Sequence, residues 1–575
     1  MQAFTEIITN INNILWHKYV LFTIVGTGIL FTIWSVFSQY RALTHGTAVL
    51  RGKYDDKNDP GAISHFQALS AALSATVGLG NIGGVALAIA LGGPGAVFWM
   101  WLVGLLGMAI KLTTVTLSML YRDTSRPGEP RGGPMYVVSK GLANLNPKWA
   151  SLGKFLGGVF CITLLTSAVT GGNMFQAWNV ADLSQEYFGI PKMATGIILA
   201  VIVAAVIIGG IKRIGSVAGR LVPFMVVLYI LAGSVVLISN AGDIIPMFKL
   251  IVHSAFNPHE AAGAFIGGTV ATAFALGMKR ALFSNEAGQG SSPIAHSAAR
   301  TKEPVREGIV AGMEPFIDTI VVCTFTALII LSTGIWNRPA EANFPSVPQV
   351  VPGAELGLWT IEDTDLPKLK NESDTLNAGS TVYLYLEGKE NMATGNNLHQ
   401  LAGNVVEKEG RLKVAWSSVS SDSQPKVKDG EVYKNLVGAT LTAKAFDSVT
   451  PGMGKWLVTL ASWLFAISTM ISWSYYGEQG MIYLLGEKSV TPYKLVYCAL
   501  IILATTNLIQ TTSQLDNFSS LGTGVMLWIN IPITLIFGYQ AMKAYKNYIH
   551  RLKNGQIGDD HEAPTLEELL SSNTK

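Results

Sequence analysis

Residues 60–110 indicate the class of fold, and they run PGAISHFQALSAALSATVGLGNIGGVALAIALGGPGAVFWMWLVGLLGMAI. This stretch contains no Asp, Glu, Lys or Arg. It is longer than one membrane-spanning helix, which needs about 20 apolar residues. The whole chain has 49% apolar and 14% charged residues, whereas soluble proteins carry about 25% charged residues. The composition predicts a polytopic membrane protein and excludes disordered, disulfide-stapled and nucleic-acid-binding chains.

Apolar runs of helical length recur along the whole chain. Lipid offers the backbone no hydrogen-bond partners, so we expect each run to form a helix. The eleven predicted membrane-spanning helices lie at residues 15–38, 64–91, 95–121, 155–180, 192–211, 217–239, 262–299, 308–334, 454–485, 492–511 and 520–546.

The distribution of Lys and Arg in the short loops predicts the orientation of these helices. Basic residues are concentrated in 39–63, 122–154, 212–220 and 300–307. They are nearly absent from the alternate loops 92–94, 181–191, 240–261 and 512–519. This alternation predicts that the N-terminus lies outside the cell and that the C-terminal tail is cytoplasmic.

One connection is much longer than the others and is predicted to lie on the outer side. Residues 335–453 contain short alternating stretches such as TVYLYLEG (381–388) and RLKVAW (411–416), separated by Gly, Asn and Asp. This pattern is typical of β-strands. We therefore expect a small β-rich domain within this connection.

If the first predicted helix is set aside, the remaining ten divide into two sets of five. The first helix of each set has an unusual composition. SAALSATVGLGNIGG (Ser70–Gly84) contains three hydroxyl residues, an Asn and four glycines, and KRALFSNEAGQGSSP (Lys279–Pro293) contains glycines, a proline, an Asn and a Glu. Gly costs a helix roughly 1 kcal/mol and Pro about 3 kcal/mol, so both helices should unwind locally. Because five is odd, the two sets run in opposite directions. Paired broken helices in an inverted repeat point to a transporter substrate site.

Several long strings of sequence resemble the alanine or glycine:cation symporter family, also called the sodium:alanine symporters. The matching stretches are SATVGLGNIGGVA (74–86), GGPGAVFWMW (92–101), GGPMYV (132–137), KRALFSNEAGQGSSPIAH (279–296), GATLTAKAF (438–446) and LFAISTMISWSYYGE (464–478). Members of usual length lack a segment that corresponds to residues 337–436. The resemblance therefore implies that this segment is an extracytoplasmic insertion.

The family's fold resembles the five-plus-five inverted repeat of the neurotransmitter:sodium symporters, the LeuT-like fold. The resemblance implies an all-α polytopic membrane protein with eleven transmembrane helices, a β-rich extracytoplasmic insertion and a location in the bacterial cytoplasmic (inner) membrane. The expected division is an N-terminal helix and linker (1–62), a first repeat (63–261), a second repeat (262–336 and 437–547), the insertion (337–436) and a cytoplasmic tail (548–575). The implied function is sodium-coupled symport of alanine or glycine. The chain is not expected to be an enzyme, and its partners are the amino acid and the lipid bilayer, without nucleic acid.

Candidate residues for the amino acid come from both broken helices. Unwound backbone exposes amides, which favour a carboxylate, and carbonyls, which favour a small cation. Gln176 is a polar residue in an apolar span and a candidate contact for the ammonium group, and Trp473 is a candidate cap over the pocket. The predicted substrate-binding residues are Thr76, Gly78, Gly80, Asn81, Gln176, Phe283, Ser284, Asn285 and Trp473.

By analogy with the fold, sodium is expected to bind the carbonyls of Ser74 and Val77 and the hydroxyls of Ser468 and Thr469, with Ser472 as a competing ligand. Charged residues at membrane depth indicate function or pairing. We predict that a base pairs with a carboxylate near the inner gate, either as a gating contact or as a static ion pair. The candidates are Lys111, Lys279, Arg280, Glu286, Glu314 and Asp318.

Two alternative functions remain open at this stage. Proton coupling in place of sodium is expected to require a carboxylate at the cation site. A membrane nutrient sensor would use the outer insertion to bind a ligand or partner. The sequence does not separate alanine from glycine, serine or D-alanine, and it leaves the oligomeric state open.

Overall fold

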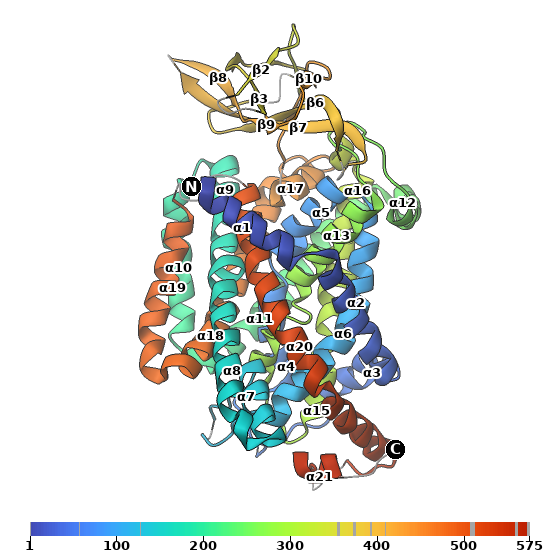
Figure 1. Cartoon of the computed structure of the whole chain (residues 1–575), viewed down its shortest axis with the longest axis vertical. Helices are drawn as coiled ribbons and strands as arrows, with labels where there is room; N and C mark the ends of the chain where they lie inside the picture. The colour runs from blue at the N-terminus through green and yellow to red at the C-terminus, as the bar shows by residue number, and fades with distance from the viewer. Residues whose placement is uncertain are drawn as a thin grey trace.

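The computed structural model describes residues 2–56, 58–126, 128–353, 357–371, 375–391, 394–408, 410–436, 438–506, 512–557 and 562–571. Most of this chain is helical, and the strands lie between residues 342 and 434. Figure 1 shows a bundle of helices with the β-rich region at one end. The N-terminus lies at the end of the bundle nearer this region, and the C-terminus lies at the opposite end.

The helices of the bundle differ widely in length. Those up to residue 256 are α1 (Gln2–Leu15), α2 (Lys18–Trp34), α3 (Ser38–Leu50), α4 (His65–Thr76), α5 (Val85–Gly92), α6 (Gly95–Tyr121), α7 (Pro134–Leu145), α8 (Ala150–Val169), α9 (Phe175–Phe188), α10 (Lys192–Ile207), α11 (Gly210–Ser239) and α12 (Ile244–Phe256). Those that follow are α13 (Val270–Asn285), α14 (Ser292–His296), α15 (Pro304–Ala311), α16 (Thr324–Ser332), α17 (Ala439–Asp447), α18 (Thr459–Leu485), α19 (Val490–Ala504), α20 (Thr512–Lys553) and α21 (Leu566–Ser571). Turns of π-helix occur at Gly80–Gly84, Thr170–Met174, Phe316–Cys323 and Gly454–Val458.

In the described part of the chain, seven helical segments are long and apolar enough to cross a membrane, and α4 with α5 forms an eighth candidate that is bent. The seven are Ile7–Trp34, Gly95–Tyr121, Pro147–Phe188, Gly210–Ser239, Pro304–Ser332, Gly454–Leu485 and Asn517–Lys553. Helices α10, α13 and α19 also occupy predicted stretches, but each is shorter than the roughly 20 residues of a full span. The described residues thus form a mostly helical polytopic protein with seven or eight candidate spans, and the count of eleven spans stays a prediction.

Individual boundaries differ from the sequence prediction for local reasons. The predicted helix 192–211 ends at Ile207, because the chain turns at Gly209 and Gly210 takes a left-handed conformation with a φ of 64°. The predicted helix 492–511 ends at Ala504, and residues 507–511 lie outside the described residues. The predicted helix 262–299 is divided into α13 and α14.

Large apolar side chains cover much of the outer surface of the bundle. Exposed apolar surfaces of this extent mark contact with a membrane rather than with water. Examples on α8, α10, α11 and α19 are Phe155, Ile162, Ile197, Val201, Phe224, Leu231, Leu495 and Val496. These side chains support the membrane location that the composition predicts.

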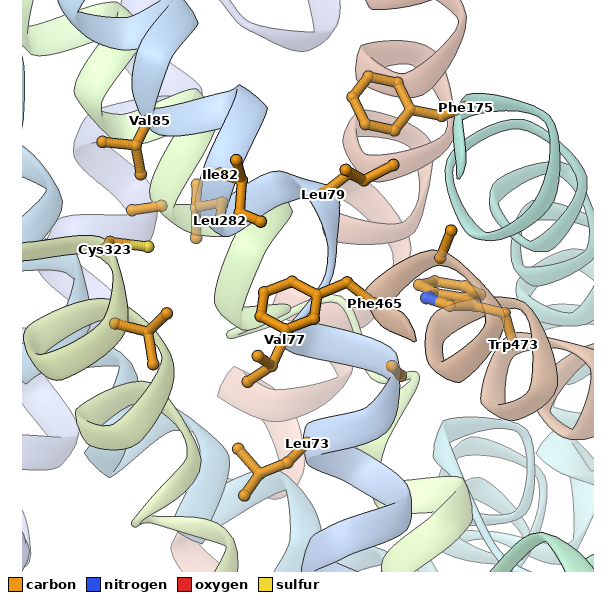
Figure 2. Packing of buried hydrophobic residues seen from close by; sticks show 14 of the residues in the cluster. Leu73, Val77, Leu79, Ile82, Val85, Phe175, Leu282, Cys323, Phe465 and Trp473 are labelled. Carbon is orange, nitrogen blue, oxygen red and sulfur yellow. The ribbon is translucent and has the colours of Figure 1, made fainter. Parts of the chain in front are cut away.

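The first broken helix consists of α4, a break at residues 77–79, the π-turn Gly80–Gly84 and α5. The Ser64 side chain accepts a hydrogen bond from the Gln67 N–H, and the Gln67 side chain accepts one from the Ser64 N–H, so a capping box starts α4. The two halves meet at 50°. Figure 2 shows apolar side chains packing on both sides of the break, with Phe465 of α18 beside Val77 and Phe175 of α9 beside Leu79. Packing on neighbouring helices therefore stabilises the bend.

The second broken helix consists of α13, the irregular segment 286–291 and α14. Helix α13 ends at Asn285, and Glu286 follows with a φ of 55°, a left-handed conformation that stops the helix. Pro293 lies in the first turn of α14, where a missing N–H costs no hydrogen bond. The local unwinding predicted for both helices is confirmed.

The β-rich region contains two antiparallel sheets. The larger sheet has the order β4-β8-β7-β6-β11-β1-β5, with β10 also paired to β6, and the smaller has the order β2-β3-β9. A separate apolar core that includes Leu384, Leu401, Val405 and Val414 lies within the region. The strands are β1 (Ala342–Asn343), β2 (Val350–Pro352), β3 (Leu358–Ile361), β4 (Thr364–Asp365), β5 (Lys368–Leu369), β6 (Thr381–Asn391), β7 (Asn396–Lys408), β8 (Arg411–Trp416), β9 (Val419–Ser420), β10 (Lys426–Val427) and β11 (Glu431–Lys434).

The β-rich region contacts the helical bundle through the segment between α12 and α13. The Tyr383 hydroxyl donates to the Ala264 carbonyl at 2.8 Å, and the Asn396 amide donates to the Ile266 carbonyl at 2.8 Å. Lys434 of β11 also forms an ion pair with Glu186 of α9 at 2.8 Å. The region is thus held against the bundle at more than one place.

Candidate functional site

A small cavity lies between the two broken helices. It has an empty volume of about 320 Å³, part of which is open to solvent. Only about 10 Å³ of this space admits the centre of a water-sized sphere, which is room for about one water molecule, so the walls must move apart to admit an amino acid. Its lining comes from the first break, the second break and the helices α8, α9, α18 and α20, through Ala75, Thr76, Gly78, Gly80, Ser167, Gly171, Gln176, Phe283, Gln289, Thr469, Trp473 and Thr523.

The structure brings most of the predicted substrate residues to this cavity. Those that line it are Thr76, Gly78, Gly80, Gln176, Phe283 and Trp473. The other three, Asn81, Ser284 and Asn285, are outside the lining and contact the helix Pro304–Ser332 instead. The predicted set therefore divides into a group around the cavity and a group behind it.

Glycine allows the first break to approach α18 closely. A Cβ atom added to Gly78 would lie 2.5 Å from the Thr469 hydroxyl oxygen. A Cβ atom added to Gly172, in the π-turn that precedes α9, would lie 2.3 Å from Cγ of Trp473. Real Cβ contacts are essentially never this short, so larger residues at these two positions would displace the walls of the cavity.

Gln176 connects two segments of irregular backbone. Its side-chain oxygen accepts a long hydrogen bond, 3.4 Å, from the Leu79 N–H in the first break. Its side-chain nitrogen donates to the Gly171 carbonyl at 3.1 Å. The amide therefore links the broken helix to the π-turn before α9 while its side chain lines the cavity.

Hydroxyl groups of α18 face the end of α4. The hydroxyls of Ser74 and Ser468 lie 2.6 Å apart, and the Ser74 hydroxyl also contacts the Ser468 carbonyl at 2.8 Å. Among the described residues, the buried hydroxyls of Thr469 and Ser472 have no hydrogen-bond partner. An unpaired buried hydroxyl is unfavourable by about 1–3 kcal/mol unless a ligand or water contacts it. Ser74 and Ser468 are thus in contact, and the Thr469 hydroxyl lies beside Gly78, the residue after the buried Val77. The role of these four residues as cation ligands stays a prediction.

Asp318 lies behind the cavity and contacts both breaks. Its carboxylate accepts hydrogen bonds from the Asn81 amide at 2.5 Å, from the Ser284 hydroxyl at 2.8 Å and from the Thr319 hydroxyl at 2.7 Å. The Asn285 amide donates to the Thr319 hydroxyl at 3.0 Å. A fully buried carboxylate therefore connects the two broken helices through uncharged donors.

The other candidate charges at membrane depth have specific partners. Lys111 donates to Glu314 at 2.7 Å, and both side chains are almost fully buried. The Ser291 hydroxyl donates to Glu286. The Lys279 ammonium lies 5.5 Å from the centre of the Trp16 ring, and Arg280 is buried. The ion pair predicted between a base and a carboxylate is thus present as Lys111–Glu314, and its role in gating stays a prediction.

Comparison with known proteins gives the family. A family model described as the sodium:alanine symporter family matches residues 1–361 and 425–562, which is most of the chain. The chain belongs to the sodium:alanine symporter family. The resemblance that its motifs indicated is confirmed. The sodium:alanine symporter family consists of membrane transporters, in agreement with the apolar helices.

Three relatives illustrate this membership. The sodium/alanine symporter AgcS of Methanococcus maripaludis is 37% identical over 494 residues, 86% of each chain. An uncharacterized transporter of Haemophilus influenzae is 31% identical over 560 residues, 96% of this chain and 98% of its own. The Bacillus subtilis protein YrbD, whose name describes a candidate sodium/proton-dependent alanine carrier, is 31% identical over 552 residues, 96% of this chain and 93% of its own.

The residues that the sodium:alanine symporter model leaves unmatched between its two segments are 362–424, and they lie in the β-rich region. The cavity itself is lined by matched residues. Sequence reasoning missed five lining residues, which are Ala75, Ser167, Gly171, Gln289 and Thr523. Gln289 was detectable, because it lies in the second break, whereas Ser167 and Thr523 reach the cavity only through helix packing.

Proposed function

We propose that this chain is a secondary active transporter that carries a small neutral amino acid, alanine or glycine, into the cell together with sodium by alternating access. The observation that carries the proposal is the cavity between the two broken helices. Its polar lining side chains are hydroxyls and amides without a formal charge, which suits a zwitterion whose own charges balance. Membership in a family of sodium:alanine symporters supports both the substrate class and the ion.

In this proposal the two walls of the cavity have different tasks. Thr76, Gly78 and Gly80 bind the substrate carboxylate at the first break. The Gly78 N–H donates to the Asn81 side-chain oxygen at 2.8 Å in this structure, so it would exchange this bond for one to the carboxylate. Gln176 accepts a hydrogen bond from the ammonium group through its side-chain oxygen. Phe283 and Trp473 limit the volume left for the substrate side chain. The small empty volume supports this limit.

The residues behind the cavity act indirectly. We propose that Asn81, Ser284 and Asn285 orient the two breaks, because their side chains bond to Asp318 and Thr319 rather than line the cavity. This assignment revises the expectation that these three side chains touch the substrate. The backbone at Ser284 still lies close to the site, since a Cβ atom added to Gly80 would be 3.6 Å from its Cα.

Sodium is proposed to bind at Ser74, Val77, Ser468 and Thr469. A hard cation binds through oxygen atoms, and unwound helix supplies carbonyl oxygens at such sites. The contact between Ser74 and Ser468 and the unpaired Thr469 hydroxyl beside Gly78 support this position. Sodium is the co-transported substrate here, not a resident cofactor.

Proton coupling is the second candidate, and Asp318 is the observation that favours it. A carboxylate in contact with both breaks can bind either a proton or a cation, and the name of one relative mentions both ions. If Asp318 is the coupling group, its protonation replaces the binding of sodium between the hydroxyls of α4 and α18.

We also propose the arrangement of the chain in the membrane. It comprises an N-terminal helix with its linker (1–62), a first repeat of five helices (63–261), a second repeat (262–336 and 437–547), an outer insertion (337–436) and a cytoplasmic tail (548–575). The N-terminus and the insertion are outside. The position of the N-terminus and the β-rich region toward one end of the bundle, opposite the C-terminus, supports this orientation (Figure 1).

Uptake of radiolabelled alanine into proteoliposomes tests the proposal. An inward sodium gradient should drive uptake, and an inward proton gradient without sodium should not. Asp318→Asn separates the candidates, because it removes the carboxylate that proton coupling requires. Asp182→Asn, which changes an acidic residue paired with Lys192 near the surface, is the matched control. If a proton gradient drives uptake, and if Asp318→Asn abolishes this uptake while Asp182→Asn preserves it, the coupling ion is the proton and not sodium.

A further inference from the structure

Five buried side chains form a continuous hydrogen-bonded network outside the cavity. Lys111 donates to Glu314 at 2.7 Å, and His296 contacts the other oxygen of Glu314 through Nε2 at 2.5 Å. The second ring nitrogen of His296, Nδ1, contacts Glu307 at 2.5 Å. Glu307 also contacts Nδ1 of His65. We call this set the His296 network; its members are His65, Lys111, His296, Glu307 and Glu314.

The His296 network joins the two broken helices at one end of the bundle. His65 is the first residue of α4, and His296 is the last residue of α14. Glu307 lies on α15 between them, and all five side chains are at most 1% exposed. Helices α4 and α15 lie toward the end of the bundle opposite the β-rich region (Figure 1). The cavity lining includes none of the five residues.

The contacts of His296 require a bound proton. A neutral imidazole has one N–H group and one nitrogen lone pair. Both nitrogens of His296 face carboxylate oxygens, so with a neutral ring one lone pair would oppose an ionised oxygen at 2.5 Å. One additional proton, either on the ring or on one of the two carboxyl groups, gives each contact a donor and an acceptor.

His65 does not supply this proton. Its Nδ1 faces Glu307, while its buried Nε2 has no hydrogen-bond partner among the described residues. A charged ring would bury an unpaired N–H donor at Nε2, which is unfavourable. The neutral ring with its proton on Nδ1 satisfies the contact with Glu307.

The charges of the network balance only with the extra proton. Lys111 and the proton carry two positive charges, and Glu307 and Glu314 carry two negative charges. Without the proton, a net negative charge is buried where desolvation is costly. The surrounding titratable and charged groups come from several elements. They are Arg122 just after α6, Asp59, Glu286 in the second break, Asp318, Tyr476 on α18, Arg306 on α15, Glu303 just before α15 with its partner Arg551 on α20, and His45 on α3, which bonds to Tyr548.

We propose that the His296 network is a proton-binding site, with one proton shared between His296 and its two glutamates, and that the bound proton latches α4 to α14. The latch weakens as pH rises, because loss of the proton leaves an uncompensated negative charge among the helices. Proton binding is independent of the transport function proposed above. The consequence for transport, which rests on that function, is that the latch closes the bundle at the end opposite the β-rich region.

Charge-balanced variants test proton binding in the full-length protein. His296→Gln alone leaves two carboxylates with only Lys111, so its thermal unfolding temperature should fall by several degrees near neutral pH. In the double variant His296→Gln/Glu307→Gln, Lys111 balances Glu314, so the network has no net charge without the extra proton. This variant should recover stability. We predict that the unchanged protein loses stability between about pH 6 and about pH 9, and the double variant should not show this decline.

His45→Gln is the matched control, because His45 is a buried histidine whose Nε2 bonds to a hydroxyl rather than to a carboxylate. It should keep the pH profile of the unchanged protein. If His296→Gln alone has the same pH profile as the unchanged protein, or if the double variant gains nothing over it, His296 holds no such proton and the proposal fails.

A cysteine at the contact between α4 and the segment after α14 tests the latch. Ala68 is buried and packs against Ala298 and Ala299, so Ala68→Cys places a thiol there in a background without Cys161, Cys323 and Cys498. A maleimide should label it about tenfold faster at about pH 9 than at about pH 6, after correction for thiolate content with a free thiol. This difference should vanish in the His296→Gln/Glu307→Gln background.

Labelling that is equally fast at both pH values after correction would overturn the latch, whatever the stability measurements show. Neither measurement uses an amino acid substrate or a sodium gradient. Failure of this proposal is therefore distinguishable from failure of the proposed transport function.

Discussion

Replacing Thr469 by Val separates a cation ligand from a structural hydroxyl. Thr469 is buried on α18, its hydroxyl lies beside Gly78, and it has no hydrogen-bond partner among the described residues. Val keeps the branched shape and removes only the hydroxyl. The substitution therefore breaks no hydrogen bond in the structure without sodium.

The two states of the protein should respond in opposite directions. Without sodium, loss of an unpaired buried hydroxyl should leave the free energy of unfolding unchanged or raise it by up to about 1–3 kcal/mol. With sodium, the lost oxygen–cation contact is comparable to a hydrogen bond to a charged group, about 1.5–3 kcal/mol. Since about 1.4 kcal/mol is a factor of ten in affinity, sodium affinity should fall roughly tenfold to a hundredfold.

Two quantities are measured. The first is the sodium concentration that gives half-maximal alanine uptake, and the second is the thermal unfolding temperature with and without sodium. Ser462→Ala is the matched control, because Ser462 is another buried hydroxyl of α18 without a described partner. The control should leave the sodium dependence unchanged. An unchanged half-saturating sodium concentration in Thr469→Val, with stability preserved, would refute the assignment of Thr469 as a ligand.

Two further substitutions test the cavity wall and the buried ion pair. In Gly172→Ala the added Cβ would lie 2.3 Å from Trp473 Cγ, so we expect a loss of about 1–3 kcal/mol of stability and weaker alanine binding. Gly26→Ala is the control, because nothing lies within 4 Å of its new Cβ, and it should change neither property. Thermal-shift and binding assays measure both effects. Lys111→Met leaves Glu314 without its ammonium partner and should lower the free energy of unfolding by about 3–5 kcal/mol, and adding Glu314→Gln should restore part of this loss in the same unfolding assay.

Much of the fold follows from local sequence signals. The charge-free stretch 60–110 predicts helices, and glycine and proline in the two unusual segments predict local unwinding, which the structure places at residues 77–79 and 286–291. The short helices α3, α7 and α12 lie in segments that the sequence analysis treated as loops. Their apolar faces are too short to give a membrane-spanning signal, so periodicity of the longer runs does not reveal them.

The candidate site could be predicted only in part. Residues of the breaks themselves, such as Gly78 and Phe283, are recognisable because irregular backbone at membrane depth is rare. The contacts of Asp318 and His296 depend on the rotation and depth of separate helices. Asp318 meets uncharged donors rather than a base, and His296 meets two glutamates, although the sequence shows only isolated polar residues at these positions.

Equilibrium binding of radiolabelled alanine to the purified protein, in sodium and in an equal concentration of potassium, tests the central claim most directly. We expect binding in sodium that glycine and unlabelled alanine displace and that leucine and phenylalanine do not. We also expect alanine to raise the affinity for sodium by the same factor by which sodium raises the affinity for alanine. Equal binding of alanine in potassium, or displacement by phenylalanine as effective as by glycine, would contradict the account.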